Sequence, residues 1–180
     1  MSRFEKIFLG ILLVFLSVAG RLVPHPWNMT PVGAAAIFAG VHIGRRAAIL
    51  IPLLSMFIGD MFLGFYSAPL LLSVYLSMSI GGLLAYWTRS ERGAWIFIAR
   101  PIATATLFYL LTNWAVWMFG SMYPHTPQGL LLAYIAGVPF FEHQVLGDVL
   151  YVSLFFGFYA WARKYSCAMR TLYAFVLRTR

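Results

Sequence analysis

The sequence predicts an all-α membrane protein, a bundle of six transmembrane helices with both termini in the cytoplasm. The prediction rests on an apolar composition, on six apolar runs, and on basic residues that gather in alternate stretches between them. Of the 180 residues, 62% are hydrophobic and 10% are charged, whereas a typical soluble domain is about 25% charged. A water-soluble chain of this length exposes too much surface to hide so many apolar side chains, so lipid must solvate much of it.

Six apolar runs qualify as membrane segments and together form one domain, residues 1–180. They are residues 7–23, 31–43, 47–65, 69–87, 101–119 and 144–162. Five contain 17 to 19 residues, enough to cross a hydrocarbon core of about 30 Å. The second reaches only about 20 Å as a helix. We expect it to be a short buried helix, or to be entered through a loop that dips into the membrane.

The basic residues set the predicted orientation. With the N-terminus inside, twelve of the thirteen basic residues lie on the cytoplasmic side, and Arg21 lies outside. The twelve are Arg3, Lys6, Arg45, Arg46, Arg89, Arg92, Arg100, Arg163, Lys164, Arg170, Arg178 and Arg180. Cytoplasmic loops carry an excess of Lys and Arg, so we expect a multi-pass protein of a bacterial inner membrane. Topology thus accounts for the net charge of +8, and nucleic acid is not expected as a partner.

Three stretches lie outside the predicted crossings. Residues 24–31 contain three prolines and cannot form a helix interior. Residues 129–141 are apolar but short and interrupted by Pro139, so we expect them to lie on or cap the outer face of the bundle. Residues 166–180 form a basic tail with aromatic side chains, which we expect along the cytoplasmic surface.

Ionisable residues within membrane segments are costly and count as functional candidates. Asp60 lies in the outer third of the third segment, Asp148 lies at a similar depth in the sixth, and Arg21 ends the first on the same side. Two interpretations are open. Arg21 pairs with Asp60 or Asp148 and locks helices together, or the three residues line a ligand cavity.

Other polar and aromatic candidates share this outer level. They are His25, Asn28, Asn113, Trp114, Trp117 and Tyr123. An apolar pocket with a few convergent polar groups is typical of a small-molecule site. The outer histidines and acids include metal-ligand types, but none has ligand spacing within one helix. The chain also lacks nucleophile–base motifs and a phosphate-binding loop, so we expect no catalytic residues, no metal and no cofactor.

Several motifs resemble those of an uncharacterised bacterial family of small six-helix membrane proteins. They are Arg21-Leu-Val-Pro-His25-Pro-Trp-Asn28-Met-Thr30-Pro-Val-Gly-Ala34, Asp60-Met-Phe-Leu-Gly64-Phe, Thr112-Asn113-Trp-Ala-Val-Trp117, Tyr123-Pro-His-Thr126, and Val138-Pro-Phe-Phe141 before Gly147-Asp148. That family is similar to the substrate-binding S-components of energy-coupling-factor (ECF) vitamin transporters. The resemblance implies an S-component-like fold with a pocket at the outer face, under the loop after the first helix.

The resemblance also implies partners. S-components dock on an ECF coupling protein driven by two ATPases, usually through an Ala-x-x-x-Ala patch on their first helix. In this chain the first segment lacks that patch, and the small-residue pairs, Ala35/Ala39 and Ala36/Gly40, lie in the second. They serve either packing within the bundle or docking on a partner. Solitary S-component relatives handle cobalamin, so a solitary transporter is also implied, with cobalamin among its ligands.

The leading hypothesis is a substrate-binding membrane subunit, or a solitary transporter, for a vitamin-like micronutrient that arrives from the periplasm. In it, Arg21 neutralises an acidic ligand group or holds the two aspartates, and Trp114, Trp117 and Tyr123 stack on a flat ring. Membrane lipid surrounds the bundle. The alternatives are a structural or assembly protein with helix-locking ion pairs, and a small intramembrane enzyme in which Asp60, Asp148 and His25 act as acid–base groups.

Overall fold

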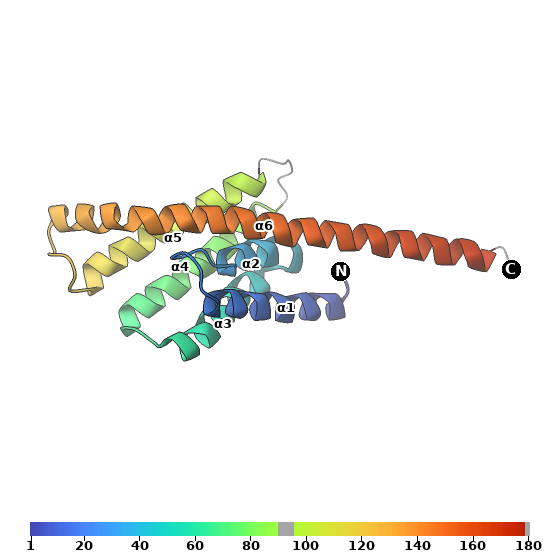
Figure 1. The fold of residues 1–180 in the computed structure, drawn as a ribbon, viewed down its shortest axis with the longest axis horizontal. Helices are drawn as coiled ribbons and strands as arrows, with labels where there is room; N and C mark the ends of the chain where they lie inside the picture. Colours follow the sequence, from blue (N-terminus) through green and yellow to red (C-terminus); the bar gives the residue numbers. More distant parts are fainter. Residues whose placement is uncertain (90–95, 179–180) are drawn as a thin grey trace.

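The computed structural model describes residues 1–89 and 96–178, and all of its regular elements are helical (Figure 1). The helices are α1 (Arg3–Leu22), α2 (Val32–Phe38), α3 (Arg45–Leu63), α4 (Ala68–Trp87), α5 (Ile96–Phe119) and α6 (Pro127–Arg178), and a π-helical turn, η1 (Ala39–Ile43), extends α2. The all-α class is confirmed, and each of the six predicted runs overlaps one helix. Arg92, Arg180 and the side chains of Arg170 and Arg178, which the sequence assigns to the cytoplasmic side, lie outside the described part.

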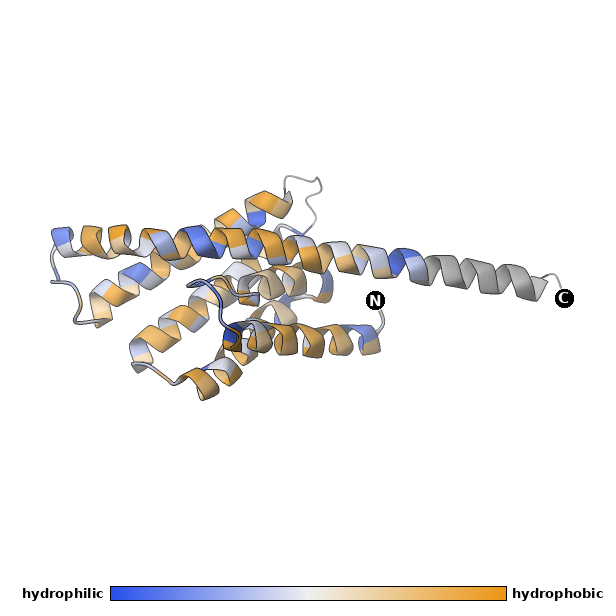
Figure 2. Ribbon diagram, viewed as in Figure 1, coloured by the Kyte–Doolittle hydropathy of each residue, from blue (hydrophilic) through white to orange (hydrophobic). Residues whose placement is uncertain are grey.

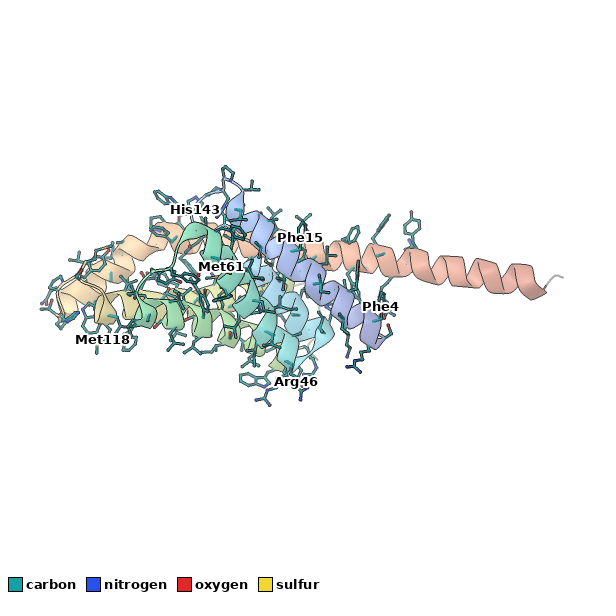
Figure 3. All side chains as sticks on the ribbon, turned by 90° about the horizontal axis from the view of Figure 1, so that it is seen from below. Phe4, Phe15, Arg46, Met61, Met118 and His143 are labelled. Atoms are coloured by element: carbon teal, nitrogen blue, oxygen red, sulfur yellow. The ribbon has the colours of Figure 1, made fainter. Side chains whose placement is uncertain are left out.

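Four helices are long and apolar enough to cross a membrane, namely Arg45–Leu63, Ala68–Trp87, Phe97–Phe119 and Pro127–Tyr165. Hydrophobic residues make up much of the coloured helices (Figure 2), and Phe4 and Phe15 of α1 point away from the bundle (Figure 3). Phe15 is 65% exposed and Phe62 is 70% exposed. Soluble monomers rarely expose large apolar patches, so these side chains face lipid. The number of six crossings and the orientation stay predictions.

Helix α2 forms the centre of the bundle. All seven of its residues are buried, so the prediction of a short buried helix is confirmed. Its small residues allow neighbouring helices to approach closely: a Cβ at Gly40 would lie 2.5 Å from the carbonyl oxygen of Gly82 in α4. Ala35 and Ala39 pack in one cluster with Leu13 of α1 and Ile51 of α3. The small-residue pairs are therefore used for packing within the bundle.

Helix α6 differs from the expectation. It runs without a break for 52 residues, with Pro139 inside it, so the prediction that Pro139 interrupts this stretch is wrong. Residues 129–141, expected to lie on or cap the outer face, belong to the first part of a continuous helix. Proline removes one backbone hydrogen bond, but apolar helices tolerate it where neighbouring groups satisfy the backbone. The hydroxyl of Tyr109 in α5 donates to the carbonyl oxygen of Tyr134 at 2.6 Å, and the Tyr134 hydroxyl donates to that of Leu110 at 2.9 Å. These reciprocal bonds hold the start of α6 against α5.

The far end of α6 continues beyond the bundle along the same axis (Figure 1). Residues 158–178 contain neither glycine nor proline, so no residue in this stretch favours a helix end. Residues 166–178, predicted as part of a basic tail along the membrane surface, are helical and run on directly from the bundle.

Candidate functional site

An ion pair joins the ends of two helices. Arg21 in the last turn of α1 pairs through Nη2 with Asp60 Oδ1 in the last turn of α3, and the Tyr75 hydroxyl of α4 donates to Asp60 Oδ2 at 2.7 Å. The side chains of Arg21 and Asp60 are 12% and 2% exposed. Of the two pairs left open by the sequence, the structure contains Arg21–Asp60. The network ties α1, α3 and α4 together.

The local sequence of α3 accommodates this pair. Met56 and Asp60 lie four residues apart on one helix face, and the Arg21 guanidinium contacts both the Met56 sulfur and the Asp60 carboxylate. Gly59 provides the space, because a Cβ there would lie 2.8 Å from Arg21 Nε. The guanidinium carries five N–H donors, and two of its nitrogens are used by these contacts.

Asp148 of α6 does not form the ion pair with Arg21 that the sequence left open. It has another role. Its carboxyl group accepts hydrogen bonds from the backbone N–H of Ala34 and from the Gln144 side chain. Pro31, which precedes α2, supplies no side-chain cap, and a carboxylate near a helix N-terminus is stabilised by the free N–H groups there. Asp148 therefore caps the central helix from outside it. Gly33 permits this approach, because a Cβ at Gly33 would overlap the carboxylate.

A cavity of about 340 Å³ lies beside the Arg21–Asp60 pair, where α1, α3, α4, α5 and α6 meet the loop that follows α1. Its polar lining consists of Arg21, His25, Asn28, Thr30, Thr112 and Gln144. Its other lining residues are Met56, Leu63, Tyr66, Val74, Met78 and Phe108. Small-molecule sites have this character, with mostly apolar walls and a few polar groups, and they occupy about 300–1,000 Å³.

The loop after α1 forms one side of the cavity and is fixed to α6. The Trp27 ring stacks on Phe140 with ring centres 5.3 Å apart, and Asn28 adopts the left-handed conformation, with φ of 60°, that asparagine tolerates better than most residues. His25 Nδ1 lies 2.6 Å from the Val23 carbonyl oxygen. Because a carbonyl oxygen only accepts, this nitrogen carries the proton, and Nε2 of the neutral ring is an acceptor.

The nine predicted site residues separate into three groups. Arg21, His25 and Asn28 line the cavity, and Asp60 lies behind Arg21. Asp148 lines a second, much smaller cavity. The remaining four, which were expected to contact or stack on a ligand, line neither cavity. They are Asn113, Trp114, Trp117 and Tyr123.

These four residues shape the end of α5 and the turn that follows. Asn113 donates its side-chain amide to the Tyr109 carbonyl oxygen at 2.8 Å, and a Cβ at Gly137 of α6 would overlap the Asn113 amide. The Trp117 indole N–H donates to the Pro124 carbonyl oxygen at 3.0 Å. Trp114 is 43% exposed, and Tyr123 is half-buried in the turn.

Sequence reasoning missed Thr30, Tyr66, Thr112 and Gln144 in the cavity lining. One signal was available, because Gln144 precedes Asp148 by four residues and so shares its helix face.

Partial burial and the nearby Asp60 carboxylate raise the pKa of Tyr66 to about 12. The Tyr66 hydroxyl is therefore protonated at neutral pH and is a potential donor to a ligand. Among the side chains that the structure describes, in residues 1–89 and 97–165, no three of His, Cys, Asp or Glu lie where they could hold a metal ion.

These features define a multi-pass membrane protein with a part-polar cavity among its helices. The chain belongs to a family of unknown function (DUF6580), which it matches over residues 2–170. No curated protein and no solved structure matches it.

Proposed function

We propose that the chain binds a small organic molecule in the larger cavity and works in its uptake, as a substrate-binding membrane subunit or a solitary transporter. The observation that carries the proposal is the cavity itself, about 340 Å³ with six polar residues in its lining. This volume lies within the range of small-molecule sites.

The lining supports a small molecule with both donors and acceptors. Arg21 and Thr112 offer donors, and His25 Nε2 and the Gln144 side-chain oxygen offer acceptors. The Arg21 charge is already balanced by Asp60, so a neutral or weakly acidic ligand fits better than a strongly charged one. The volume favours a molecule of one or two rings over a corrinoid such as cobalamin.

The resemblance to S-components adds the uptake role and the periplasmic entry side. The small-residue pairs of α2 are buried inside the bundle, so a docking surface for an ECF coupling protein would have to be formed by other residues. This favours the solitary transporter over the docked subunit.

The test is native mass spectrometry of the full chain, purified gently in detergent. We expect an adduct of a single small molecule, which is lost in Gln144→Leu and in Thr112→Val. Trp114→Phe is the matched control, because Trp114 lies outside the lining of both cavities, and it should keep the adduct. A wild-type chain that carries no adduct, and that binds none of a panel of vitamins and metal ions, would overturn the proposal.

A structural role for the outer charges makes a separate prediction. If the chain is an assembly protein, Asp60→Asn destabilises the fold without altering uptake, and the cavity variants Gln144→Leu and Thr112→Val change no binding or uptake. Comparing these variants in the same preparation separates the two functions.

A further inference from the structure

The second cavity has room for one water-sized particle. Its volume is about 10 Å³, close to the minimum that admits one water. It lies inside the bundle, among α2, α4, α5 and α6. Its four polar lining residues, Ser77, Thr104, Gln144 and Asp148, are each no more than 6% exposed. A particle in this cavity is therefore held by the protein and not by bulk solvent.

The two hydroxyl groups of this cavity offer lone pairs only. Ser77 donates its single hydroxyl hydrogen to the Ser73 carbonyl oxygen at 2.6 Å, and Thr104 donates to the Arg100 carbonyl oxygen at 2.9 Å. A hydroxyl has one donor and two acceptor sites. With their hydrogens directed along their own helices, both oxygens can act toward the cavity as acceptors.

Asp148 contributes a buried acceptor atom without a partner. Its Oδ2 atom is buried and has no hydrogen-bond partner among the described residues, while the group as a whole accepts from Ala34 and Gln144. An unpaired buried polar atom is costly, and a buried charge more so. The basic side chain at this end of the bundle, Arg21, is paired with Asp60 and does not line this cavity.

We propose that this cavity binds one dehydrated monovalent cation, held by Asp148 Oδ2, Ser77 Oγ and Thr104 Oγ1. A single carboxylate balances one positive charge, and hard cations prefer oxygen ligands. In this proposal Asp148 is ionised, and a water molecule would supply hydrogens but no charge to balance the carboxylate. Na⁺ and K⁺ share this chemistry, and the experiment below distinguishes them.

The site does not depend on what occupies the larger cavity. Met78, Phe108 and Gln144 line both spaces, so one layer of side chains separates the cation site from the ligand site. Gln144 also donates to Asp148, so a residue that lines the ligand cavity is in direct contact with the carboxyl group of the cation site.

The test is the thermal stability of the full chain in detergent, at fixed pH and ionic strength, in the chlorides of Na⁺, K⁺ and the bulky cation N-methylglucamine. A ligand that binds the native state raises Tm. We expect a rise of about 5 °C at saturation with Na⁺ or K⁺ relative to N-methylglucamine, and the more effective of the two identifies the cation. Asp148→Asn, which keeps an acceptor for Ala34, should abolish the difference.

Two further variants test the geometry without changing charge. A Cβ at Gly81 would lie 3.4 Å from Thr104 Cβ, an ordinary contact, so Gly81→Ala should fold, place a methyl group in the cavity and lose the cation response. Ser77→Ala should shift the response to higher cation concentration. Ser73→Ala is its matched control, because the half-buried Ser73 also donates to a carbonyl four residues back and lies outside the cavity.

Two results would overturn the proposal. One is a Tm that ignores the cation and rises as the pH falls, since a proton on Asp148 would then neutralise the carboxylate. The other is an equal cation response in wild type, Gly81→Ala and Asp148→Asn, since the cations would then act elsewhere on the chain.

Discussion

The Arg21–Asp60 pair allows a quantitative prediction about helix association. Asp60→Asn keeps the side-chain volume and removes the charge, so the Arg21 guanidinium is left buried without a counter-charge. Breaking a buried pair in this way costs about 3–5 kcal/mol. We expect about 3 kcal/mol for Asp60→Asn, because Arg21 is 12% exposed and borders the cavity, where water can solvate it.

Removing the arginine of the pair should lower the free energy of unfolding by more than removing the aspartate charge. In Arg21→Met the carboxylate that remains is only 2% exposed and keeps the Tyr75 hydroxyl as its donor. We expect about 4–5 kcal/mol, at the upper end of the range for an orphaned buried charge. The double variant should lose less than the sum of the two, by about 2 kcal/mol or more, because residues in one ion-pair network are coupled.

The assay is unfolding of the four proteins by SDS in mixed micelles, followed by circular dichroism, which yields the free energy of unfolding for each corner of the cycle. Arg46→Met is the control. Arg46 is exposed at the start of α3 (Figure 3), and its replacement should change stability by less than about 0.5 kcal/mol. Single-variant losses that add up to the double-variant loss within about 0.5 kcal/mol would refute the coupling and the structural importance of the pair.

Three further predictions concern single contacts and are measured by the same SDS titration, by Tm or by amide exchange. Tyr75→Phe should lose about 1.5–3 kcal/mol, the usual range for a hydrogen bond to a charged group; an unchanged midpoint would show that the Asp60 contact contributes nothing. Gly33→Ala should lower Tm because its Cβ would overlap the Asp148 carboxylate, whereas Gly157→Ala, whose Cβ would meet no described atom within 4 Å, should keep or raise it; equal effects would contradict the close approach. Trp117→Phe removes the indole donor to Pro124, and we expect faster amide exchange in residues 120–126, with the helices unaffected; uniform protection in both proteins would count against that role.

The helices were predictable because lipid demands long apolar runs, and the outer charges were predictable because buried charges are costly. The Arg21–Asp60 pair was one of two options raised by that argument, and the structure contains it. Asp148 was judged by its charge alone. Its function as a cap for α2 depends on where α6 passes α2, which no local pattern in the sequence specifies.

The aromatic residues near the end of α5 show where sequence reasoning stops. The faces of α4 and α5 hardly differ in polarity, so the sequence does not indicate which side of α5 faces the bundle. Trp114 and Trp117 were predicted to share a depth with Arg21, and they lie outside the cavity lining. Pro139 was interpreted as a break, and the two hydrogen bonds of Tyr134, with Tyr109 and Leu110, that hold the start of α6 against α5 join residues 25 and 24 positions apart.

The length and straightness of α6 have a mechanical consequence. Asp148 lies 30 residues before the end of this helix at Arg178, a distance of about 45 Å at 1.5 Å per residue. The interval contains no proline, and Gly157 lies inside the continuous helix, so this part of α6 acts as a stiff lever. A tilt of about 5° around the position of Asp148 moves the far end by about 4 Å, so a small change in how α6 packs beside the two cavities becomes a displacement large enough for another molecule to detect.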